Sequence, residues 1–470
     1  MKNFMQEEKA IEIARAVRDR GGRAYFVGGY VRDRLIDILG NNDHKVIPIS
    51  PSPKDIDIEV HGLNADEIRS ILENLGQVIT IGKSFGIYSL KNYNIDIAMP
   101  RMEENTGSGH RDFAVYTDPF LDPAKAASRR DFTINALMED VITGEIFDFF
   151  GGMEDLRTEI IRHVNEEKFI EDPLRVLRGA QFASRFDFHI APETVELCRR
   201  IDLSNLPRER VEEELHKGLC KGKRPSKFFE ALREMNQLKT WFKELEDTIG
   251  LEQNPDFHPE GDVWTHMMMA IDKGTAFVSG EGPLTENPYE FMLFVLLHDL
   301  GKVVTTQVVD GRIRSAGHEI EGMDLVRNFL DRITGNKQTK RYVINMVPLH
   351  MKPNRMAADC AKIKSTNRMF DEACCPEDLI YFAEVDYTVD QDCISHGDGT
   401  TVARNREFLT KRLEIYREYM SRPYVRGEDL IRAGMTPGSD FKVALQLAHK
   451  HRLAGVPKEE SIKQILGELV

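Results

Sequence analysis

The chain has 470 residues, more than a single hydrophobic core ordinarily serves, so its length predicts two to four domains. Hydrophobic residues make up 41% and charged residues 30% of the chain, and no apolar run approaches the roughly 18 to 20 residues of a membrane helix, which excludes a membrane-spanning protein. The net charge of −14 excludes a protein that coats nucleic acid over its whole surface, although a local basic groove remains compatible with it. Six cysteines without a CxxC pair and an N-terminus without an apolar signal core predict reduced thiols and a cytoplasmic location.

The first chemical motif is a Gly-Gly turn between a strand and a helix. The segment AYFVGGYVRD predicts a strand over Ala24–Val27, a turn at Gly28 and Gly29, and a helix directly after them. Adjacent glycines let the backbone approach a ligand closely, and a helix N-terminus presents free N–H groups to phosphate. Arg32 and Asp33 follow in the first helical turn. An arginine there suits a triphosphate, and the aspartate suits a partner that braces it.

Two further strands carry acidic residues. In KDIDIEV the side chains alternate with the strand period of two, so Asp55 and Asp57 share one face while the isoleucines between them point to the core. The strand NIDIAMPR repeats the pattern around Asp96. Neighbouring carboxylates repel unless a cation lies between them, and Mg²⁺ combines a few protein carboxylates with substrate phosphates. The three acids therefore predict a catalytic Mg²⁺ site for in-line nucleotidyl transfer.

A helix further along the chain presents an aspartate and two arginines on one face. Arg130 and Asp131 in SRRDFTINAL precede an apolar segment, and EDPLRVLRGAQF starts with Asp172 as a helix cap and a proline in the first helical position. Asp172, Arg175 and Arg178 recur at every third position. Such a face offers an acceptor and donors to a base edge, and a salt bridge within the helix is the alternative.

Together these motifs resemble the class II tRNA nucleotidyltransferases, the CCA-adding enzymes, whose head is similar to that of bacterial poly(A) polymerase. The resemblance spans about residues 22 to 186. It implies a polymerase-beta-like head with a small mixed sheet, followed by an all-α neck and body. It also implies that Asp55 and Asp57 bind Mg²⁺ and that Asp172 and Arg175 act as a protein template for the bases of CTP and ATP. The expected nucleotide-binding set is Gly28, Gly29, Arg32, Arg130, Asp131, Asp172, Arg175, Arg178 and Gln181.

Two positions depart from the family's pattern. The segment NNDHKVIPISPS after the first helix is an insertion, and its polar, proline-containing composition predicts a surface loop. Gln181 stands where the family usually has a second nucleotide-contacting arginine, one helical turn after Arg178. Glutamine keeps a hydrogen bond but loses the charge, so we expect an altered nucleotide affinity or selectivity. The segment 101–110 is similar to the family's flexible loop, which is thought to help switch the nucleotide pocket.

A second constellation of histidines and aspartates follows in HPEGDVWTH, FMLFVLLHDLGK, GHEIEG, PLHMKP and EVDYTVD. The His298–Asp299 doublet ends an apolar helix that would bury it, and buried adjacent polar groups need partners such as a metal ion. Mixed histidine and carboxylate ligands favour Mn, Ni, Co or Fe over Mg. The expected ligands are His266, His298, Asp299 and Asp386 for one ion, and His318 and His350 for a second.

This pattern resembles the HD phosphohydrolase superfamily, and some tRNA nucleotidyltransferases carry such a domain C-terminally with a closely similar HPEGDVWTH segment. The resemblance implies an all-α domain with 2′,3′-cyclic phosphodiesterase, 2′-nucleotidase and phosphatase activity. Lys302 is expected to position phosphate, and His258 is assigned a structural role.

The predicted chain is thus α+β, with a nucleotidyltransferase head (1–150), a helical neck and body (151–250), an HD domain (251–400) and a helical tail (401–470). Its predicted function is the template-independent addition of CCA, from CTP and ATP, to the 3′ end of tRNA, with contacts to the acceptor stem and repair of 3′ ends by the HD domain. Two alternatives remain open: a partial CC- or A-adding enzyme or poly(A) polymerase, and an RNA- or nucleotide-binding regulator with a sensing HD domain. A monomer and a homodimer are both compatible with the sequence.

Overall fold

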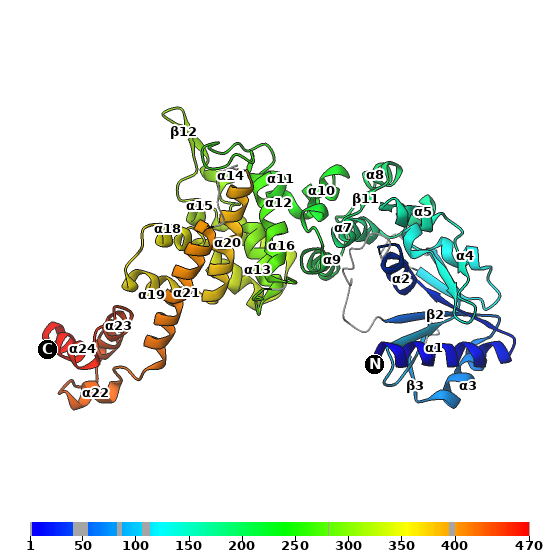
Figure 1. Ribbon diagram of the computed structural model, residues 1–470, viewed down its shortest axis with the longest axis horizontal. Helices are drawn as coiled ribbons and strands as arrows, with labels where there is room; N and C mark the ends of the chain where they lie inside the picture. The colour runs from blue at the N-terminus through cyan, green and yellow to red at the C-terminus, as the bar shows by residue number, and fades with distance from the viewer. Residues whose placement is uncertain are drawn as a thin grey trace. The chain divides into compact units, whose positions relative to one another are not determined.

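The computed structural model describes residues 2–40, 55–81, 87–105, 113–280, 282–393 and 400–469. They form two compact units (Figure 1): the first comprises Met1–Leu215 and Lys227–Gln237, and the second comprises His216–Ser226 and Leu238–Val470. The predicted α+β class is confirmed, and the finer division into four domains stays a prediction. The predicted insertion loop and residues 106–110 of the predicted flexible loop lie outside the described residues.

A seven-stranded mixed sheet organises the first unit, in the order β3-β4-β5-β2-β1-β8-β9. Within it, β2 and β5 run parallel, whereas the other neighbours are antiparallel. Its strands are β1 (Arg23–Val27), β2 (Ile56–His61), β3 (Val78–Ile81), β4 (Ile87–Leu90), β5 (Ile95–Ala98), β8 (Met138–Asp140) and β9 (Ile146–Phe147). A separate antiparallel pair consists of β6 (Arg101–Asn105) and β7 (Phe113–Thr117).

The alternation of β2 and β5 follows the predicted period of two. Their isoleucines are at most 2% exposed, and Asp57 lies opposite Asp96 in the parallel register. Because successive side chains of a strand point to opposite faces, the two aspartates share the face away from these buried isoleucines. The sheet thereby holds two carboxylates side by side on rigid backbone.

The remaining elements of the first unit are mostly short helices. They are α1 (Lys2–Asp19), α2 (Gly29–Gly40), α3 (Ala65–Leu75), α4 (Pro123–Ser128), η2 (Thr133–Asn135), α5 (Gly152–Arg157), α6 (Glu166–Ile170), α7 (Leu174–Phe186) and α8 (Pro192–Cys198), with a parallel pair β10 (Ile160–Ile161) and β11 (His189–Ile190). Helices α9 (Arg208–Lys221) and α10 (Ser226–Glu234) lie where the chain passes between the units. Helix α7 begins at Leu174, one residue later than predicted, and the Asp172 carboxylate accepts a hydrogen bond from its N–H at 3.1 Å.

The second unit is helical, apart from one hairpin among its described residues. Its elements are α11 (Leu238–Glu246), α12 (Val263–Gly274), η3 (Thr275–Phe277), α13 (Pro288–Leu297), α14 (Lys302–Thr305), β12 (Gln307–Val309), β13 (Arg312–Arg314), α15 (His318–Glu321), α16 (Met323–Ile333), α17 (Lys337–Met346), η4 (Val347–Leu349), α18 (Lys352–Ala358), α19 (Ile363–Glu372), α20 (Pro376–Cys393), α21 (Thr400–Ser421), α22 (Gly427–Arg432), α23 (Ser439–Leu453) and α24 (Lys458–Leu469). Helix α13 is apolar on all sides and buried from Phe291 to Leu297, as its sequence predicted. It packs against α12 and α17.

No helix among the described residues is long and apolar enough to cross a lipid bilayer.

Candidate functional site

The predicted motifs of the first unit meet at Gly28. Its φ of +70° lies in the left-handed region that favours glycine. A Cβ atom at this position would lie 3.1 Å from Nη1 of Arg130 and 3.7 Å from Oδ2 of Asp57. The Gly-Gly turn, the acidic strand and the RRD segment therefore converge on one point, which we call the head site (Gly28, Asp57, Arg130).

Burial and neighbouring charges shift the pKa of the Asp57 carboxyl group. Asp57 is solvent-exposed at residue level, but partial burial of its carboxyl together with the charges of Asp96 and Asp55 raises its pKa to about 6, against the opposing effect of Arg130. A cation between the carboxylates would relieve this repulsion. The three head acids do not form a close group of metal-binding side chains. Among the described residues, the groups of three side chains whose donor atoms lie within 4.8 Å of one another are all in the second unit. The head carboxylates are thus more open, as befits an ion that also takes substrate oxygens.

Glu59 is a residue of this region that sequence reasoning missed. Its carboxylate is 3% exposed, and Oε2 lies 3.7 Å from Nη2 of Arg129 and 3.8 Å from Nη2 of Arg130. Burial raises its pKa, but a hydrogen bond with His61 and the two arginine charges outweigh burial, so the pKa lies below its ordinary value. Glu59 therefore stays ionised and holds Arg130 beside Gly28. It is the next acid in the alternation of KDIDIEV, a signal that could have identified it.

Arg32 is held entirely by the protein in this structure. It is 3% exposed, its Nε donates to Oδ1 of Asp33 at 2.8 Å, and its Nη1 donates to Oδ1 of Asn135 at 2.5 Å. Its guanidinium also lies 4.7 Å from the ring centre of Phe186. Asp33 additionally pairs with Arg185, whose Nη2 lies 3.2 Å from Oδ2. Asp33 is thus the bracing partner that the motif indicated, and the nucleotide contact of Arg32 stays a prediction.

The arginines of α7 are fixed by neighbours outside their own helix. Nε and Nη2 of Arg178 lie 2.8 and 2.6 Å from Oδ2 of Asp131. The other oxygen of Asp131 accepts hydrogen bonds from Nδ2 of Asn135 and from a backbone N–H. Arg175 donates to the backbone carbonyls of residues 168 and 129, at 2.6 and 2.8 Å. Asp131 therefore acts on Arg178 by holding it, and Gln181 is 2% exposed within the same helix.

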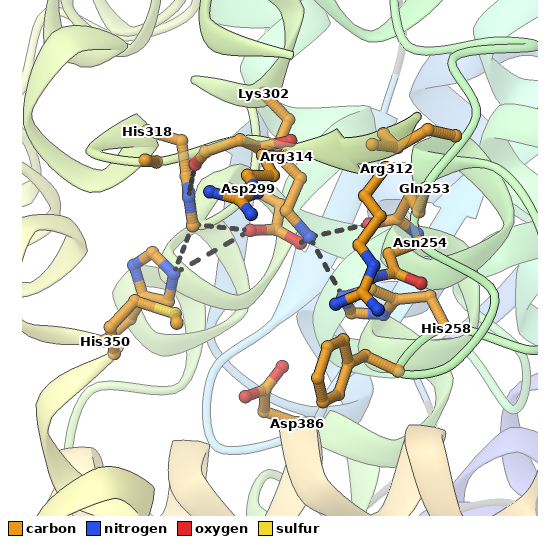
Figure 2. Close-up of a pocket in the computed structure, with 15 residues that line it drawn as sticks. Gln253, Asn254, His258, Asp299, Lys302, Arg312, Arg314, His318, His350 and Asp386 are labelled. Carbon is orange, nitrogen blue, oxygen red and sulfur yellow. Dashed lines mark hydrogen bonds and ion pairs between the residues drawn. The ribbon is translucent and has the colours of Figure 1, made fainter. Parts of the chain in front are cut away.

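The second unit brings its six predicted metal ligands together around Asp299, which is 2% exposed. Figure 2 shows Asp299, His318, His350 and Asp386 among them. Oδ2 of Asp299 lies 3.3 Å from Nε2 of His298 and 3.6 Å from Nε2 of His266. Oδ1 lies 3.0 Å from Nε2 of His318 and 3.7 Å from Nε2 of His350. Oδ1 of Asp386 lies 3.4 Å from Nε2 of His266. One carboxylate thus separates two pairs of histidines, which is the arrangement of a ligand shared by two ions.

The histidines of this cluster, which we call the His/Asp site, are oriented as ligands. In each histidine, Nδ1 forms a hydrogen bond of 2.7 to 2.8 Å and Nε2 faces the aspartates. The partner of Nδ1 is the Glu260 carboxylate for His266, and a backbone carbonyl for the others: Val295 for His298, Ser315 for His318 and Val347 for His350. An N–H donated through Nδ1 leaves the Nε2 lone pair for a metal. Nε2 of His266 and of His298 are buried without a hydrogen-bond partner among the described residues. Buried nitrogens of this kind call for an ion, so the residues fit a metal centre.

Glu260 is a second residue that sequence reasoning missed. Its side chain is 1% exposed and accepts hydrogen bonds from Nδ1 of both His266 and His258, at 2.7 and 2.9 Å. Burial raises its pKa, but these two hydrogen bonds outweigh burial and hold the pKa at about 2. A permanently ionised carboxylate behind a histidine raises its basicity as a ligand. The glutamate in HPEGDVWTH precedes His266 by less than two helical turns, and this proximity was the available signal.

Lys302 and His258 also lie at the His/Asp site. Nζ of Lys302 lies 2.7 Å from Oδ2 of Asp299, 2.6 Å from Oε1 of Gln253 and 3.4 Å from Nε2 of His258. The lysine therefore already neutralises the central carboxylate, and its role toward phosphate stays a prediction. His258, taken as structural from the sequence, lines the cavity itself.

A cavity of about 620 Å³ opens over Asp299, His318, His350 and Asp386 (Figure 2). Imidazole and carboxylate ligands together suit a transition metal, and a pair of such ions polarises a phosphate ester and activates water. Arg312 and Arg314 of β13 line the same cavity. The arrangement can therefore bind and hydrolyse a phosphate ester that enters from solvent.

Two family models match the first half of the chain. The description "Poly A polymerase head domain" matches residues 24–162, and "Probable RNA and SrmB- binding site of polymerase A" matches residues 187–249. The first match contains the whole head site.

Curated relatives match a larger part of the chain. The multifunctional CCA protein of Ralstonia nicotianae is 33% identical over 320 residues, which is 66% of this chain and 67% of the relative. The multifunctional CCA protein of Nitrosospira multiformis is 33% identical over 339 residues, covering 71% of this chain and 75% of the relative. That of Nitrosomonas europaea is 36% identical over 315 residues, covering 66% and 69%.

Solved structures share the fold. The CCA-adding enzyme of Thermotoga maritima, determined in complex with tRNA, aligns with a TM-score of 0.60 at 21% identity over 98% of this chain and 95% of its own. The CCA-adding enzyme of Bacillus stearothermophilus, determined in complex with CTP, aligns with a TM-score of 0.62 at 21% identity over 100% and 98%.

Proposed function

The chain belongs to the family of multifunctional CCA proteins, and we propose that its first unit adds CCA to tRNA while its second unit hydrolyses phosphate esters at RNA 3′ ends. The chain is thus a tRNA nucleotidyltransferase. The convergence of Gly28, Asp57 and Arg130 supports the first activity, because it brings a glycine turn, an acid and a cation to one point. The shared position of Asp299 supports the second. Both activities belong to cytoplasmic tRNA maturation.

In the head, we assign Mg²⁺ binding to Asp55 and Asp57, with Asp96 as the third acid of the site. A Mg²⁺ ion held there would neutralise negative charge during nucleotidyl transfer. We assign triphosphate contact to Gly28 and Gly29, where a Cβ atom would lie 3.1 and 3.4 Å from an arginine nitrogen. Arg130, held by Glu59, faces the same space and neutralises phosphate charge.

We assign base selection to Asp172 and Arg175, and further nucleotide contact to Arg178 and Gln181. Hydrogen bonds to the backbone hold Arg175, and Asp131 holds Arg178, so both guanidinium groups are pre-oriented. Rigid donors discriminate between C and A edges better than mobile ones, because a wrong base leaves them unpaired. The uncharged Gln181 makes this face of α7 less cationic than an arginine would.

In the second unit, we assign one metal position to His266, His298, Asp299 and Asp386 and another to Asp299, His318 and His350. The ligand set suits Mn, Ni, Co or Fe. Lys302 holds the shared carboxylate and lines the cavity, and we assign it the positioning of phosphate. The substrates that fit this site are phosphomonoesters and 2′,3′-cyclic phosphodiesters.

Product length decides between full and partial CCA addition. Purified protein is incubated with Mg²⁺ and a tRNA that ends before CCA, with CTP alone, ATP alone or both. Full CCA addition gives two added residues with CTP alone and three with both nucleotides. An A-only enzyme extends only a tRNA that already ends in CC, and a poly(A) polymerase gives long products from ATP. No incorporation under any condition would rule out the proposed activity of the head.

The Gln181→Arg variant, run in the same assay, tests whether this position tunes nucleotide choice. A changed ratio of C to A incorporation shows that it does, and an unchanged ratio removes Gln181 from the selecting set.

A further inference from the structure

The hairpin β12–β13 directs two arginines into the cavity over the His/Asp site. In β13, Arg312 and Arg314 are two residues apart, so their side chains lie on the same face of the strand. They pair in register with Val309 and Gln307 of β12. Both side chains line the cavity that also exposes Asp299, and Figure 2 shows them there. The hairpin thus adds two positive charges next to a metal centre.

Neither guanidinium has a hydrogen-bond or ion-pair partner among the described residues. In the described part of the chain, no carboxylate forms an ion pair with Arg312 or Arg314, and both are exposed. Lys302, in the same cavity, is in contrast buried and pairs with Asp299. The chain has a net charge of −14, so a surface with two neighbouring unpaired arginines differs from the acidic character of the chain as a whole. Planar guanidinium groups match phosphate oxygens in a two-point geometry, which indicates a phosphate as their ligand.

The cavity also exposes an aromatic ring. Phe257 is 67% exposed although it is a large apolar side chain, and it lines the cavity together with Asn254. An exposed ring beside a phosphate-binding group suits base stacking, which tolerates any base because every base has a flat face. The cavity of about 620 Å³ has room for more than a single phosphate group.

We propose that Arg312 and Arg314 bind the internal phosphodiester of an RNA strand whose terminal phosphate lies at the His/Asp site and whose last base stacks on Phe257. The cavity then selects RNA 3′ ends over free mononucleotides, because a mononucleotide lacks the phosphodiester that the arginines hold. This inference rests on the proposed phosphohydrolase function of the second unit and assigns the residues that recognise its substrate.

The reaction is a hydrolysis and needs no co-reactant other than water. A water oxygen forms a bond to phosphorus, one bond from phosphorus to a ribose oxygen breaks, and that oxygen takes a proton. The product is a 2′- or 3′-phosphomonoester beside a free hydroxyl. The arginines make and break no bond in this step and act on the neighbouring phosphate.

The test compares two substrates that differ by one nucleoside and the phosphodiester that links it: a dinucleotide ending in adenosine 2′,3′-cyclic phosphate, and adenosine 2′,3′-cyclic phosphate itself. The full chain, loaded with Mn²⁺ or Ni²⁺, is compared with an Arg312→Ala/Arg314→Ala variant. We expect kcat/KM for the dinucleotide to fall at least tenfold, mainly through KM, and that for the mononucleotide to stay within twofold. A lysine double variant should restore part of the loss. Arg327→Ala on α16, an exposed arginine paired with Asp324 outside the cavity lining, should leave both substrates unchanged.

Two results overturn the inference: an equal fall for both substrates, or no fall for either. Phe257→Ala should weaken both substrates, since each carries a base, and Phe257→Trp should restore them. If the wild-type chain hydrolyses neither substrate, the proposed phosphohydrolase function fails. Binding of a dinucleotide ending in a 3′-phosphate, measured by calorimetry, then decides separately. Weaker binding by the arginine variant sustains the inference, and equal binding overturns it.

Discussion

The carboxylate of Glu260 accepts a hydrogen bond from Nδ1 of His266 at 2.7 Å, and both side chains are at most 1% exposed. This contact fixes the ring so that Nε2 points to Asp299 and Asp386. The geometry of the metal position therefore depends on a residue that is not itself in contact with the shared carboxylate.

Replacing Glu260 with glutamine should weaken metal binding about 10- to 100-fold, since a carboxylate behind a ligating histidine sets its orientation and basicity. Calorimetric titration with Mn²⁺ or Ni²⁺ measures the change. Asp324→Asn, on an exposed side chain of α16, is the matched control and should bind metal as the wild type does. Unaltered affinity in the Glu260 variant would show that the hydrogen bond serves folding alone.

The two active centres should fail independently. An Asp55→Ala/Asp57→Ala variant should lose at least 99% of CTP and ATP incorporation, because Mg²⁺ loses its protein ligands, and should retain hydrolysis of cyclic phosphates within about twofold. Radiolabelled incorporation and phosphate release from the same preparation measure both. Joint loss of the two activities would contradict separate centres.

Nucleotidyl transfer should need more Mg²⁺ at low pH. The pKa of Asp57 is raised to about 6, first by burial and then by the charges of Asp96 and Asp55. The proton and the metal compete for this carboxylate, so the neutral form grows as the pH falls through 6. The Mg²⁺ concentration that gives half-maximal incorporation should rise roughly tenfold for each pH unit below this pKa. A constant requirement between pH 5 and 8 would show that Asp57 does not titrate near pH 6.

Asp131→Asn should reduce both stability and nucleotide binding. Burial raises the pKa of Asp131, but the charge of Arg178 and hydrogen bonds from Asn135 and Phe132 outweigh burial, so the pKa lies below its ordinary value. The carboxylate therefore stabilises the fold at pH above about 4 and loses this effect as the pH falls through its folded-state pKa. Removing the charge should cost about 1–3 kcal/mol at pH 7, measured by urea unfolding. KM for nucleotide should rise, because Arg178 loses the group that holds it.

Metal removal should loosen the second unit selectively. Without ions, the His/Asp site holds four imidazoles beside two carboxylates with no metal between them. A metal ion that binds only the folded state stabilises it by ~2.7 kcal/mol when its concentration is about 100 times its Kd. Hydrogen exchange in α12 and α13 should therefore slow when Mn²⁺ or Ni²⁺ is added and quicken after chelation. A His318→Ala/His350→Ala variant should show a smaller effect. Equal protection with and without metal would contradict an ion in this site.

Much of the fold and of the site could be predicted from local patterns. The period of two in KDIDIEV and NIDIAMPR placed Asp57 and Asp96 on one face of the sheet, because a strand leaves its side chains no other choice. The apolar run before His298 predicted a buried helix whose end carries the doublet, and α13 ends at Leu297. The motif resemblance supplied the family, which the curated relatives bear out.

Other parts depend on contacts between segments that are distant in the chain. Glu59 became a partner of Arg130 only when β2 and the segment after α4 came together. The packing of the helices places Asp299 between His298 and His318. The packing of one hairpin brings Arg312 and Arg314 to the same cavity.

By itself, the sequence determined which side chains share a face of one strand or helix, because backbone periodicity is local. It thereby identified the three acids that we assign to the head and the six side chains that we assign as ligands of the His/Asp site. Only the tertiary structure decided which side chains from distant segments form hydrogen bonds and ion pairs with one another, and which line the cavity without such a partner among the described residues. Asp131 is bound to Arg178 and Glu260 to His266, whereas Arg312 and Arg314 face an open cavity. Hydrogen bonds and ion pairs of this kind act over a few ångströms in space, whatever the separation along the chain.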